Sequence, residues 1–275
     1  MDTHPATDLY LDLMAKVLTR YGFEGRNTSV MPAGDSYESH LWQLLQNAMP
    51  GRRVRMVEPG QFDPDLRRDG RDWPADAETM VGLERLTNIR SCIEQVLADD
   101  VPGDLIETGV WRGGSCIYMR AVLRAHGDTQ RTVWVADSFQ GLPPSDGRFD
   151  ADIGDDHHTY SELAISADEV RDNFRRYDLL DDGVKFLEGW FADTLPSAPI
   201  EKLALLRIDG DMYASTMDAL EALYDKVAPG GFVIVDDYGA VPACAEAVED
   251  FRKERGITDE LVEIDWTGQY WRKSA

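Results

Sequence analysis

The second half of the chain alternates between short apolar runs and amphipathic segments. The apolar runs have the length and the β-branched content of buried strands, and they cover residues 104–109, 132–137, 184–190, 203–209 and 229–237. The other segments have apolar residues three and four positions apart, which predicts helices at 79–98, 115–126, 166–179, 216–227 and 243–256. A terminal hairpin is expected from 261–265 and 268–273. Strands that alternate with helices indicate a mostly parallel sheet covered on both faces, and therefore a doubly wound α/β domain.

The first part of the chain lacks this alternation. Residues 7–21 and 38–48 have the apolar spacing of short helices, whereas the rest of 22–78 is rich in Gly, Pro, Arg and Asp. We therefore expect an N-terminal helical and irregular extension, residues 1–78, packed on a main domain formed by residues 79–275.

Charge narrows the class of partner. The chain has 28 Lys and Arg residues against 51 Asp and Glu residues, which gives a formal net charge of −23. A phosphate field would repel such a protein, so we expect neither a nucleic acid nor a membrane surface as a partner.

The cellular compartment is indicated by three further features. Cys92, Cys116 and Cys244 show no CxxC spacing, which is typical of buried cysteines in a reducing compartment. No run approaches the roughly 18 consecutive apolar residues of a membrane span. The first residues carry acids where a signal peptide needs lysines. These features together predict a cytoplasmic protein.

A glycine-rich loop follows the first strand of the expected domain, at residues 107–115 (ETGVWRGGS). Gly109 permits a tight turn, and Gly113 and Gly114 allow a ligand to approach the next helix closely. The spacing differs from G-x-G-x-x-G, and no G-K-[ST] follows for a nucleoside triphosphate. An acid at the start of the loop suits a ligand with an ammonium or sulfonium group. The candidate ligand contacts here are Glu107, Thr108, Gly109 and Ser115.

An acid also ends the second strand. Asp137, with Ser138 beside it, is placed to accept hydrogen bonds from both ribose hydroxyls of an adenosine. Gly189, Trp190 and Phe191 follow the third strand and are expected to flank the adenine ring, although aromatic residues at strand ends are commonly packing residues. Weaker candidates for the border of the same site are Thr79, Met80 and Arg85.

Three stretches, residues 101–123, 136–144 and 206–239, resemble the macrocin O-methyltransferase family. The resemblance extends over about residues 78–272. It implies a class I, Rossmann-like methyltransferase that uses S-adenosylmethionine and Mg²⁺. The expected substrate is a small-molecule glycoside, methylated on a sugar hydroxyl of a macrolide, an aminocoumarin or a related antibiotic. The family is usually dimeric, so the resemblance also implies a homodimer.

Carboxylates end two strands that we expect to be neighbours. Asp209 closes one strand, and Asp236 and Asp237 close the next. Adjacent strands lie about 4.8 Å apart, so these groups can converge, and a cation would then neutralise them. Oxygen ligands without Cys or His favour Mg²⁺, and the resemblance implies the same three ligands. Asp211 is expected outside this set because an extended backbone would point it the other way. The alternative is a set of solvated acids.

The chemistry that we expect is metal-assisted proton removal. Two neighbouring sugar hydroxyls that chelate Mg²⁺ would be oriented and acidified. Asp209 is our candidate general base and also a candidate cofactor contact. The deprotonated oxygen then attacks the methyl carbon of the sulfonium. The long connection 141–165 is expected to be a lid, with His157 and His158 as weak candidates for substrate contact.

Three other functions stay open at this point. The segment Asp209-Gly210-Asp211 resembles the DxD motif of metal-dependent glycosyltransferases. A catechol-type O-methyltransferase would also use a chelated pair of hydroxyl groups. A non-catalytic binding protein could retain the nucleotide-binding fold. The sequence does not identify the acceptor sugar or its aglycone.

Overall fold

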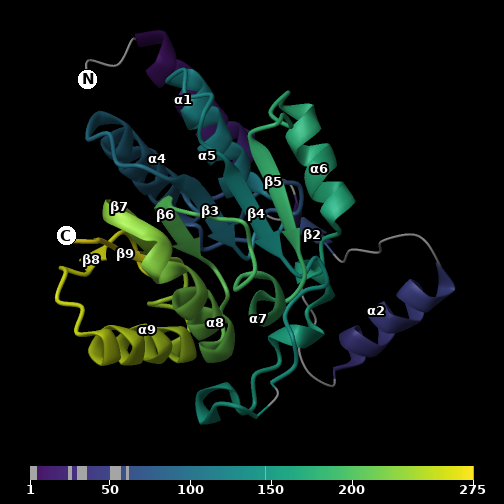
Figure 1. Cartoon of the computed structure of the whole chain (residues 1–275). Coiled ribbons are helices and arrows are strands. Elements are labelled where there is room, and N and C mark those ends of the chain that lie inside the picture. The colour runs from purple at the N-terminus through teal and green to yellow at the C-terminus, as the bar shows by residue number, and fades with distance from the viewer. Residues whose placement is uncertain are drawn as a thin grey trace.

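The computed structural model of the chain describes residues 5–23, 27–29, 36–49, 57–59, 62–145 and 147–274. Its central feature is a seven-stranded sheet of order β5-β4-β3-β6-β7-β9-β8 (Figure 1). The strands are β3 (Asp104–Thr108), β4 (Val133–Asp137), β5 (Val184–Glu188), β6 (Leu203–Ile208), β7 (Val227–Val235), β8 (Val262–Glu263) and β9 (Gln269–Arg272). The first five are parallel, and β9 pairs antiparallel with both β7 and β8. The mostly parallel sheet and the terminal hairpin are therefore confirmed.

Helices cover both faces of this sheet, which confirms the doubly wound arrangement (Figure 1). On one face lie α1 (Pro5–Leu18), α4 (Leu83–Ala98), α5 (Gly114–Ala125) and α6 (Ala167–Arg176). On the other face lie α7 (Phe191–Thr194), α8 (Tyr213–Leu223) and α9 (Pro242–Arg255). None of the helices in the described ranges combines the length and the apolar character that a bilayer crossing requires.

The order of the strands places a crevice outside the carboxyl ends of the central strands. From β3 the chain continues to β4 and β5 on one side, and it then returns to β6 and β7 on the other. Thr108 pairs with Ile208, and Ile208 pairs with Val235, so the carboxyl ends of β3, β6 and β7 are level. Ligands of open α/β sheets bind at such a switch point, outside the carboxyl ends of the strands.

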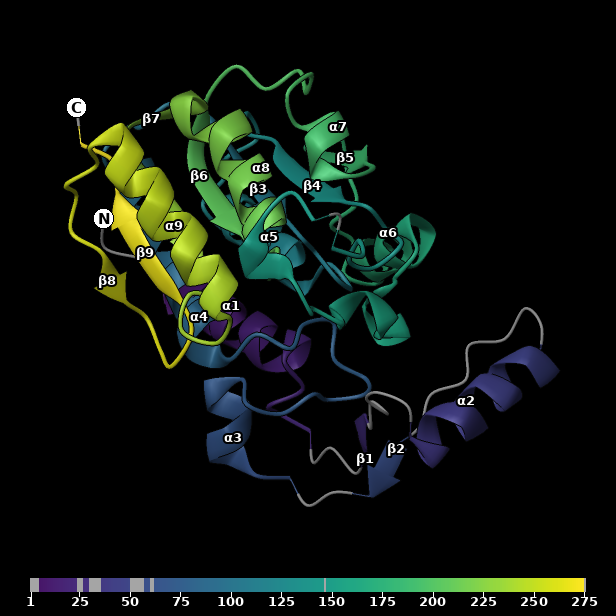
Figure 2. The same ribbon diagram turned by 90° about the horizontal axis from the view of Figure 1, so that it is seen from below.

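The N-terminal part divides into a packed and a projecting region. Leu11 and Leu18 of α1 are fully buried in the same core as α4 and α5. In contrast, α2 (Tyr37–Ala48) has no buried residue and extends away from the sheet (Figure 2). The remaining elements here are α3 (Pro64–Asp69) and a small antiparallel pair, β1 (Asn27–Ser29) and β2 (Val57–Pro59). Parts of the predicted extension, at 1–4, 24–26, 30–35, 50–56 and 60–61, lie outside the described residues.

Several predicted helix boundaries differ by a few residues, and the largest shift of a helix start has a clear structural reason. The helix expected from residue 79 begins at Leu83, with Gly82 as its N-cap. The guanidinium of Arg67 donates from Nη2 to the carbonyl oxygens of Met80 (2.7 Å) and Val81 (3.4 Å). These carbonyl oxygens therefore accept hydrogen bonds from a buried arginine instead of from the N–H groups of a helical turn.

Candidate active site

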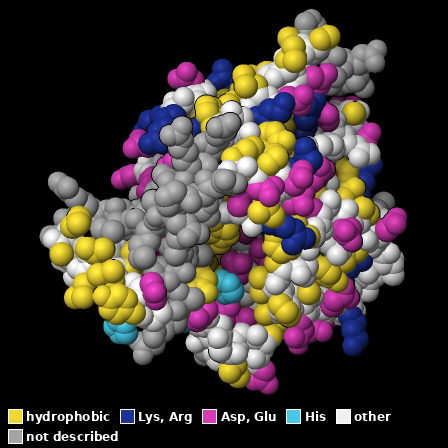
Figure 3. Space-filling model, turned by 180° about the vertical axis from the view of Figure 1, so that it is seen from behind, with side chains coloured by type: hydrophobic (Ala, Val, Ile, Leu, Met, Phe, Trp, Pro, Cys, Tyr) yellow, Lys and Arg dark blue, Asp and Glu magenta, His cyan; other side chains and the backbone are white. Residues whose placement is uncertain are grey.

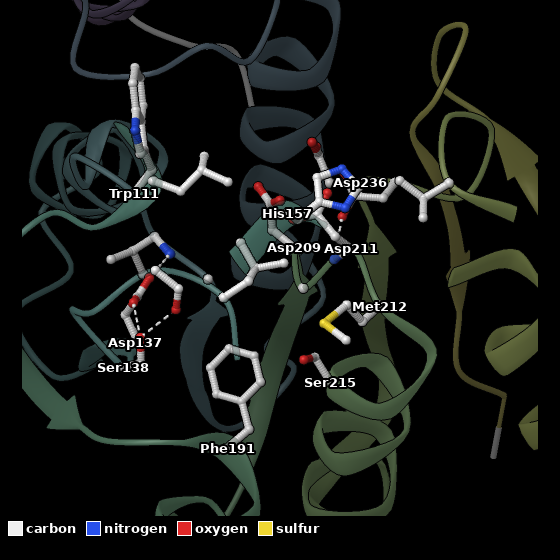
Figure 4. Close-up of a pocket in the computed structure, with 18 of the residues that line it drawn as sticks. Trp111, Asp137, Ser138, His157, Phe191, Asp209, Asp211, Met212, Ser215 and Asp236 are labelled. Atoms are coloured by element: carbon white, nitrogen blue, oxygen red, sulfur yellow. Dashed lines mark hydrogen bonds between the residues drawn. The ribbon is translucent and has the colours of Figure 1, made fainter. Parts of the chain in front are cut away.

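A cavity of about 710 Å³ opens at the predicted crevice. This volume lies within the range of small-molecule sites, which is about 300–1,000 Å³. Most of the predicted site residues line it, namely Glu107, Gly109, Ser115, Asp137, Ser138, His157, Trp190, Phe191, Asp209, Asp236 and Asp237 (Figure 4). The weaker candidates Thr79, Met80 and Arg85 line it too.

Three predicted residues do not line this cavity. Thr108 is fully buried, and its hydroxyl donates to the carbonyl oxygen of Arg207 (3.4 Å). Gly189 turns the chain with a φ of 141°, and its N–H donates to the carbonyl oxygen of Asp137 (2.9 Å). His158 is exposed on the lid segment. Thr108 and Gly189 thus link neighbouring strand ends by hydrogen bonds and do not face the cavity.

Asp137 holds the glycine loop in place. Its Oδ2 accepts the N–H of Val110 (2.8 Å), and its Oδ1 accepts the N–H of Phe139 (2.7 Å). Burial raises the pKa of Asp137, although these hydrogen bonds favour the charged form. The carboxylate also lines the cavity, so it can face the ribose of a bound nucleoside.

Gly109 is required by the close approach of two strand ends. Its φ is 86°, and a Cβ at this position would lie 1.6 Å from the carbonyl oxygen of Asp209. Only glycine fits there. The glycine loop and the acidic turn after β6 therefore touch directly, which brings the two halves of the cavity together.

Glu107 has partners inside the protein. It is only 2% exposed, and it accepts hydrogen bonds from Arg207 and from Sγ of Cys116 (2.8 Å). Burial raises the pKa of Glu107, while the guanidinium of Arg207 lowers it. The negative charge that we expected to face a sulfonium is thus shared with an arginine of the next strand.

The three acids at the ends of β6 and β7 lie together. Asp209, Asp236 and Asp237 each offer an oxygen within 4.8 Å of the others. Burial, together with the neighbouring carboxylates, raises the pKa of both Asp209 and Asp237. Mg²⁺ holds oxygens at about 2.0–2.1 Å, so a shared ion needs them about 4 Å apart or closer. The donor set, three carboxylate oxygens close to one another, fits a small divalent cation.

Two buried arginines balance part of this charge. Arg207 is fully buried and pairs with Glu107, with Asp236 and with Oδ2 of Asp209 (2.8 Å). Arg85 pairs with Asp236 and, through Nε, with Asp265 (2.9 Å). Arg207 was not among the site residues predicted from the sequence. Its signal was a charged residue inside an otherwise apolar strand, because a buried charge requires partners.

Replacing Arg207 with methionine should destabilise the protein by about 3–5 kcal/mol, since it leaves buried carboxylates without their cation. Urea unfolding of the purified variant measures this change. The control is Arg175→Met, which removes an exposed pair with Asp172 and should cost at most about 1 kcal/mol. Equal losses in the two variants would contradict the structural role of Arg207.

Asp211 lies where we expected, outside the group of three acids, but for a different reason. The backbone is no longer extended there, because Asp211 has a φ of 56° and donates its N–H to Oδ2 of Asp237 (3.1 Å). Asp211 lines the cavity beside His157 (Figure 4). Burial raises the pKa of Asp211 to about 6, and the nearby His157 acts in the opposite direction. The acidic end of the cavity therefore has a fourth carboxylate beside the group of three.

The segment expected to be a lid, residues 141–165, supplies part of the lining of the cavity. It contains three short 3₁₀ helices, η1 (Asp150–Asp152), η2 (His157–Thr159) and η3 (Ser161–Leu163). The indole N–H of Trp111 in the glycine loop donates to the carbonyl oxygen of Glu162 (2.9 Å). The lid residues that line the cavity are Gly141, Leu142, Pro143, Pro144, Arg148, Asp152, His157, Tyr160 and Leu163.

Further lining residues come from segments that carried no sequence signal. Trp73 belongs to the N-terminal part, and Trp266 and Thr267 belong to the turn before β9. The hydroxyl of Thr267 donates to the carbonyl oxygen of Asp236 (2.8 Å), so this turn also supports the acidic group. Many other Asp and Glu side chains lie on the surface. They are the magenta side chains on the face seen in Figure 3.

Comparison with known proteins places the chain in a family. The family model described as Macrocin-O-methyltransferase (TylF) matches residues 7–273. A relative from Streptomyces olivaceus, 8-demethyl-8-(2,3-dimethoxy-alpha-L-rhamnosyl)-tetracenomycin-C 4'-O-methyltransferase, is 51% identical over 283 residues, covering 99% of this chain and 95% of the relative. The demethyldecarbamoylnovobiocin O-methyltransferase of Streptomyces niveus is 49% identical over 284 residues, covering 99% and 96%.

Solved structures agree with this placement. The structure of the O-methyltransferase NovP superposes with a TM-score of 0.82 at 48% identity, covering 98% of this chain and 100% of NovP. The calicheamicin methyltransferase CalS11 shares the fold, with a TM-score of 0.56 at 18% identity over 87% of this chain and 94% of CalS11. The chain therefore belongs to the macrocin O-methyltransferase family, and it is an O-methyltransferase.

Proposed function

We propose that this enzyme transfers the methyl group of S-adenosylmethionine to a sugar hydroxyl of a small-molecule glycoside, with the help of Mg²⁺. The observation that carries the proposal is the group of three acids, within 4.8 Å of one another, in the cavity that Asp137 and the glycine loop also line. The names of two relatives describe methylation of a rhamnosyl tetracenomycin and of demethyldecarbamoylnovobiocin. Membership in a methyltransferase family removes the glycosyltransferase alternative.

The cofactor half of the cavity suits S-adenosylmethionine, whose use the family and the fold imply. Asp137 and Ser138 would hold the ribose, and Trp190 and Phe191 would border the adenine. The glycine loop borders this half through Gly109, Val110 and Trp111, and the methionine portion would lie against it. Glu107, at the start of the glycine loop, and Ser115, in the first turn of α5, also line this half.

The acidic half suits a divalent cation. Arg207 and Arg85 pair with four carboxylates, Glu107, Asp209, Asp236 and Asp265. Asp237 adds a fifth beside Asp209 and Asp236, so carboxylates outnumber guanidinium groups five to two. Such an excess of buried negative charge is costly unless a cation shares it. Asp209, Asp236 and Asp237 would hold Mg²⁺.

When bound, Mg²⁺ supplies Lewis-acid activation of the acceptor hydroxyl, and S-adenosylmethionine supplies the methyl group. Asp209 is our candidate for the general base that accepts the hydroxyl proton, because it lies at the contact between the two halves of the cavity. Asp211 is the second candidate, because it lines the cavity without belonging to the group of three. The walls of the cavity orient the acceptor for attack on the methyl carbon.

The function is tested by incubating the purified chain with S-adenosylmethionine, Mg²⁺ and a panel of acceptors. We expect an α-L-rhamnoside or a related deoxysugar glycoside to gain one methyl group on the sugar, as fragmentation mass spectrometry would show. Transfer to a simple catechol alone would overturn the sugar assignment in favour of the catechol-type alternative. The dimer and the cytoplasmic location stay predictions.

A further inference from the structure

The lid segment supplies a buried carboxylate to a helix that begins beside the acidic group. Asp152 is 3% exposed and lies 61 and 62 residues from its two partners in the chain. Its Oδ1 accepts the N–H of Tyr213 (2.8 Å), and its Oδ2 accepts the N–H of Ala214 (2.9 Å). Tyr213 and Ala214 are the first two residues of α8. Asp152 therefore acts as an N-cap that comes from another part of the chain.

Helix α8 has no cap of its own. The N-cap residue is Met212, whose side chain accepts no hydrogen bond. The first N–H groups of a helix have no partner within it, so they need an acceptor from elsewhere. A carboxylate is favourable at this end because of the helix dipole. If the lid segment moved away, these two N–H groups would lose the acceptor that Asp152 provides.

Two further contacts hold the same part of the lid against α8. The rings of Phe149 and Tyr213 lie 4.6 Å apart. The guanidinium of Arg148 forms two hydrogen bonds, both of 3.1 Å, with the carboxylate of Asp218 in α8. The residues around η1 thus lie against the first two turns of α8.

The beginning of α8 determines where the acidic turn ends. Only three residues, 209–211, separate β6 from Met212. Asp209 is fixed from the strand side, because its N–H donates to the carbonyl oxygen of Thr108 (2.8 Å). On the helix side, the N–H of Met212 donates to the carbonyl oxygen of Gly210 (2.6 Å). A displacement of the first residues of α8 is therefore passed directly to Asp211.

We infer that Asp152 is a positioning residue that couples the placement of the lid segment to the geometry of the acidic turn at Asp209 and Asp211. With the lid seated, both carboxylate oxygens hold the start of α8, and the turn is held at both ends. With the lid displaced, the start of α8 can fray and the acids lose their placement. Methyl transfer is thereby favoured when the lid covers the cavity.

The test compares Asp152→Ala and Asp152→Asn with Asp150→Asn in the full-length protein. Asp150 is an exposed acid on the same 3₁₀ helix, so its variant has the same change of charge as Asp152→Asn without the hydrogen bonds. Hydrogen exchange of peptides covering residues 209–216 reports the amides of Tyr213 and Ala214. For Asp152→Ala we expect about tenfold faster exchange there, the factor that corresponds to losing a helix cap. Asp152→Asn retains one acceptor oxygen and should show a smaller increase.

The kinetic part of the test rests on the proposed function, whereas the exchange part does not. We expect kcat of Asp152→Ala to fall about tenfold in parallel with exchange, while the affinity for S-adenosylhomocysteine stays within about twofold. Exchange equal to that of Asp150→Asn would overturn the inference. So would faster exchange throughout α4 and α5, which would show a general loss of stability. If Asp152→Ala does not fold, Asp152→Asn decides by the same criteria.

Discussion

Replacing Asp209 with asparagine is expected to lower kcat/KM for methyl transfer by about 10²–10⁴-fold, the range of a lost general acid–base group. The substitution removes the proposed base and one of the three acidic oxygens at once. It also weakens the pair with Arg207. Affinity for Mg²⁺, measured by titration calorimetry, should fall in the same variant.

Two further variants separate the roles within the acidic turn. Asp211→Asn should retain the Mg²⁺ affinity, because Asp211 lies outside the group of three. A large loss of kcat in Asp211→Asn with little loss in Asp209→Asn would transfer the role of base to Asp211. The control is Glu201→Gln, an exposed acid just before the opposite end of β6, for which we expect unchanged kinetics. Full activity in both Asp209→Asn and Asp211→Asn would contradict the proposed mechanism.

Replacing Asp137 with alanine is expected to weaken the binding of S-adenosylhomocysteine by at least about 100-fold. The variant loses two proposed hydrogen bonds to ribose hydroxyls, each worth about 1.5–3 kcal/mol when the acceptor is charged. It also releases the N–H groups of Val110 and Phe139, which shape the cofactor side of the cavity. Titration calorimetry with S-adenosylhomocysteine measures the change.

A neighbouring acid provides the control for this result. Glu188 ends β5, the strand beside β4, and pairs with Arg171 outside the lining of the cavity. Glu188→Ala should bind S-adenosylhomocysteine as the parent protein does. Unchanged binding in Asp137→Ala would remove the adenosine from this half of the cavity. Circular dichroism of both variants checks that the fold is intact.

The parts of the fold that were predictable depend on local pattern. Buried strands of a parallel sheet are continuous apolar runs, so β3 to β7 were identified within a few residues. The convergence of Asp209 with Asp236 and Asp237 followed from the same pattern, because the ends of neighbouring parallel strands meet at one edge. Geometry that follows from strand order is thus accessible from sequence.

The parts that were missed depend on contacts between distant segments. The start of α4 at Leu83 is determined by Arg67, which takes two carbonyls that a helical turn would have used. Asp152 looked like one acid among many in a long loop, and only the folded chain shows that both its oxygens cap α8. Arg207 was also missed, but the sequence did contain a signal for it. A charged residue in a buried strand predicts paired carboxylates nearby.

The most direct test of the account is the rate of methyl transfer to a deoxysugar glycoside in excess chelator, followed by addition of Mg²⁺. We predict that chelation reduces the rate to background and that Mg²⁺ restores it in the parent protein. Asp237→Asn, which retains Asp209 but loses one acidic ligand, should need a higher Mg²⁺ concentration for the same recovery. A full rate in excess chelator would contradict the assignment of a metal to these three acids.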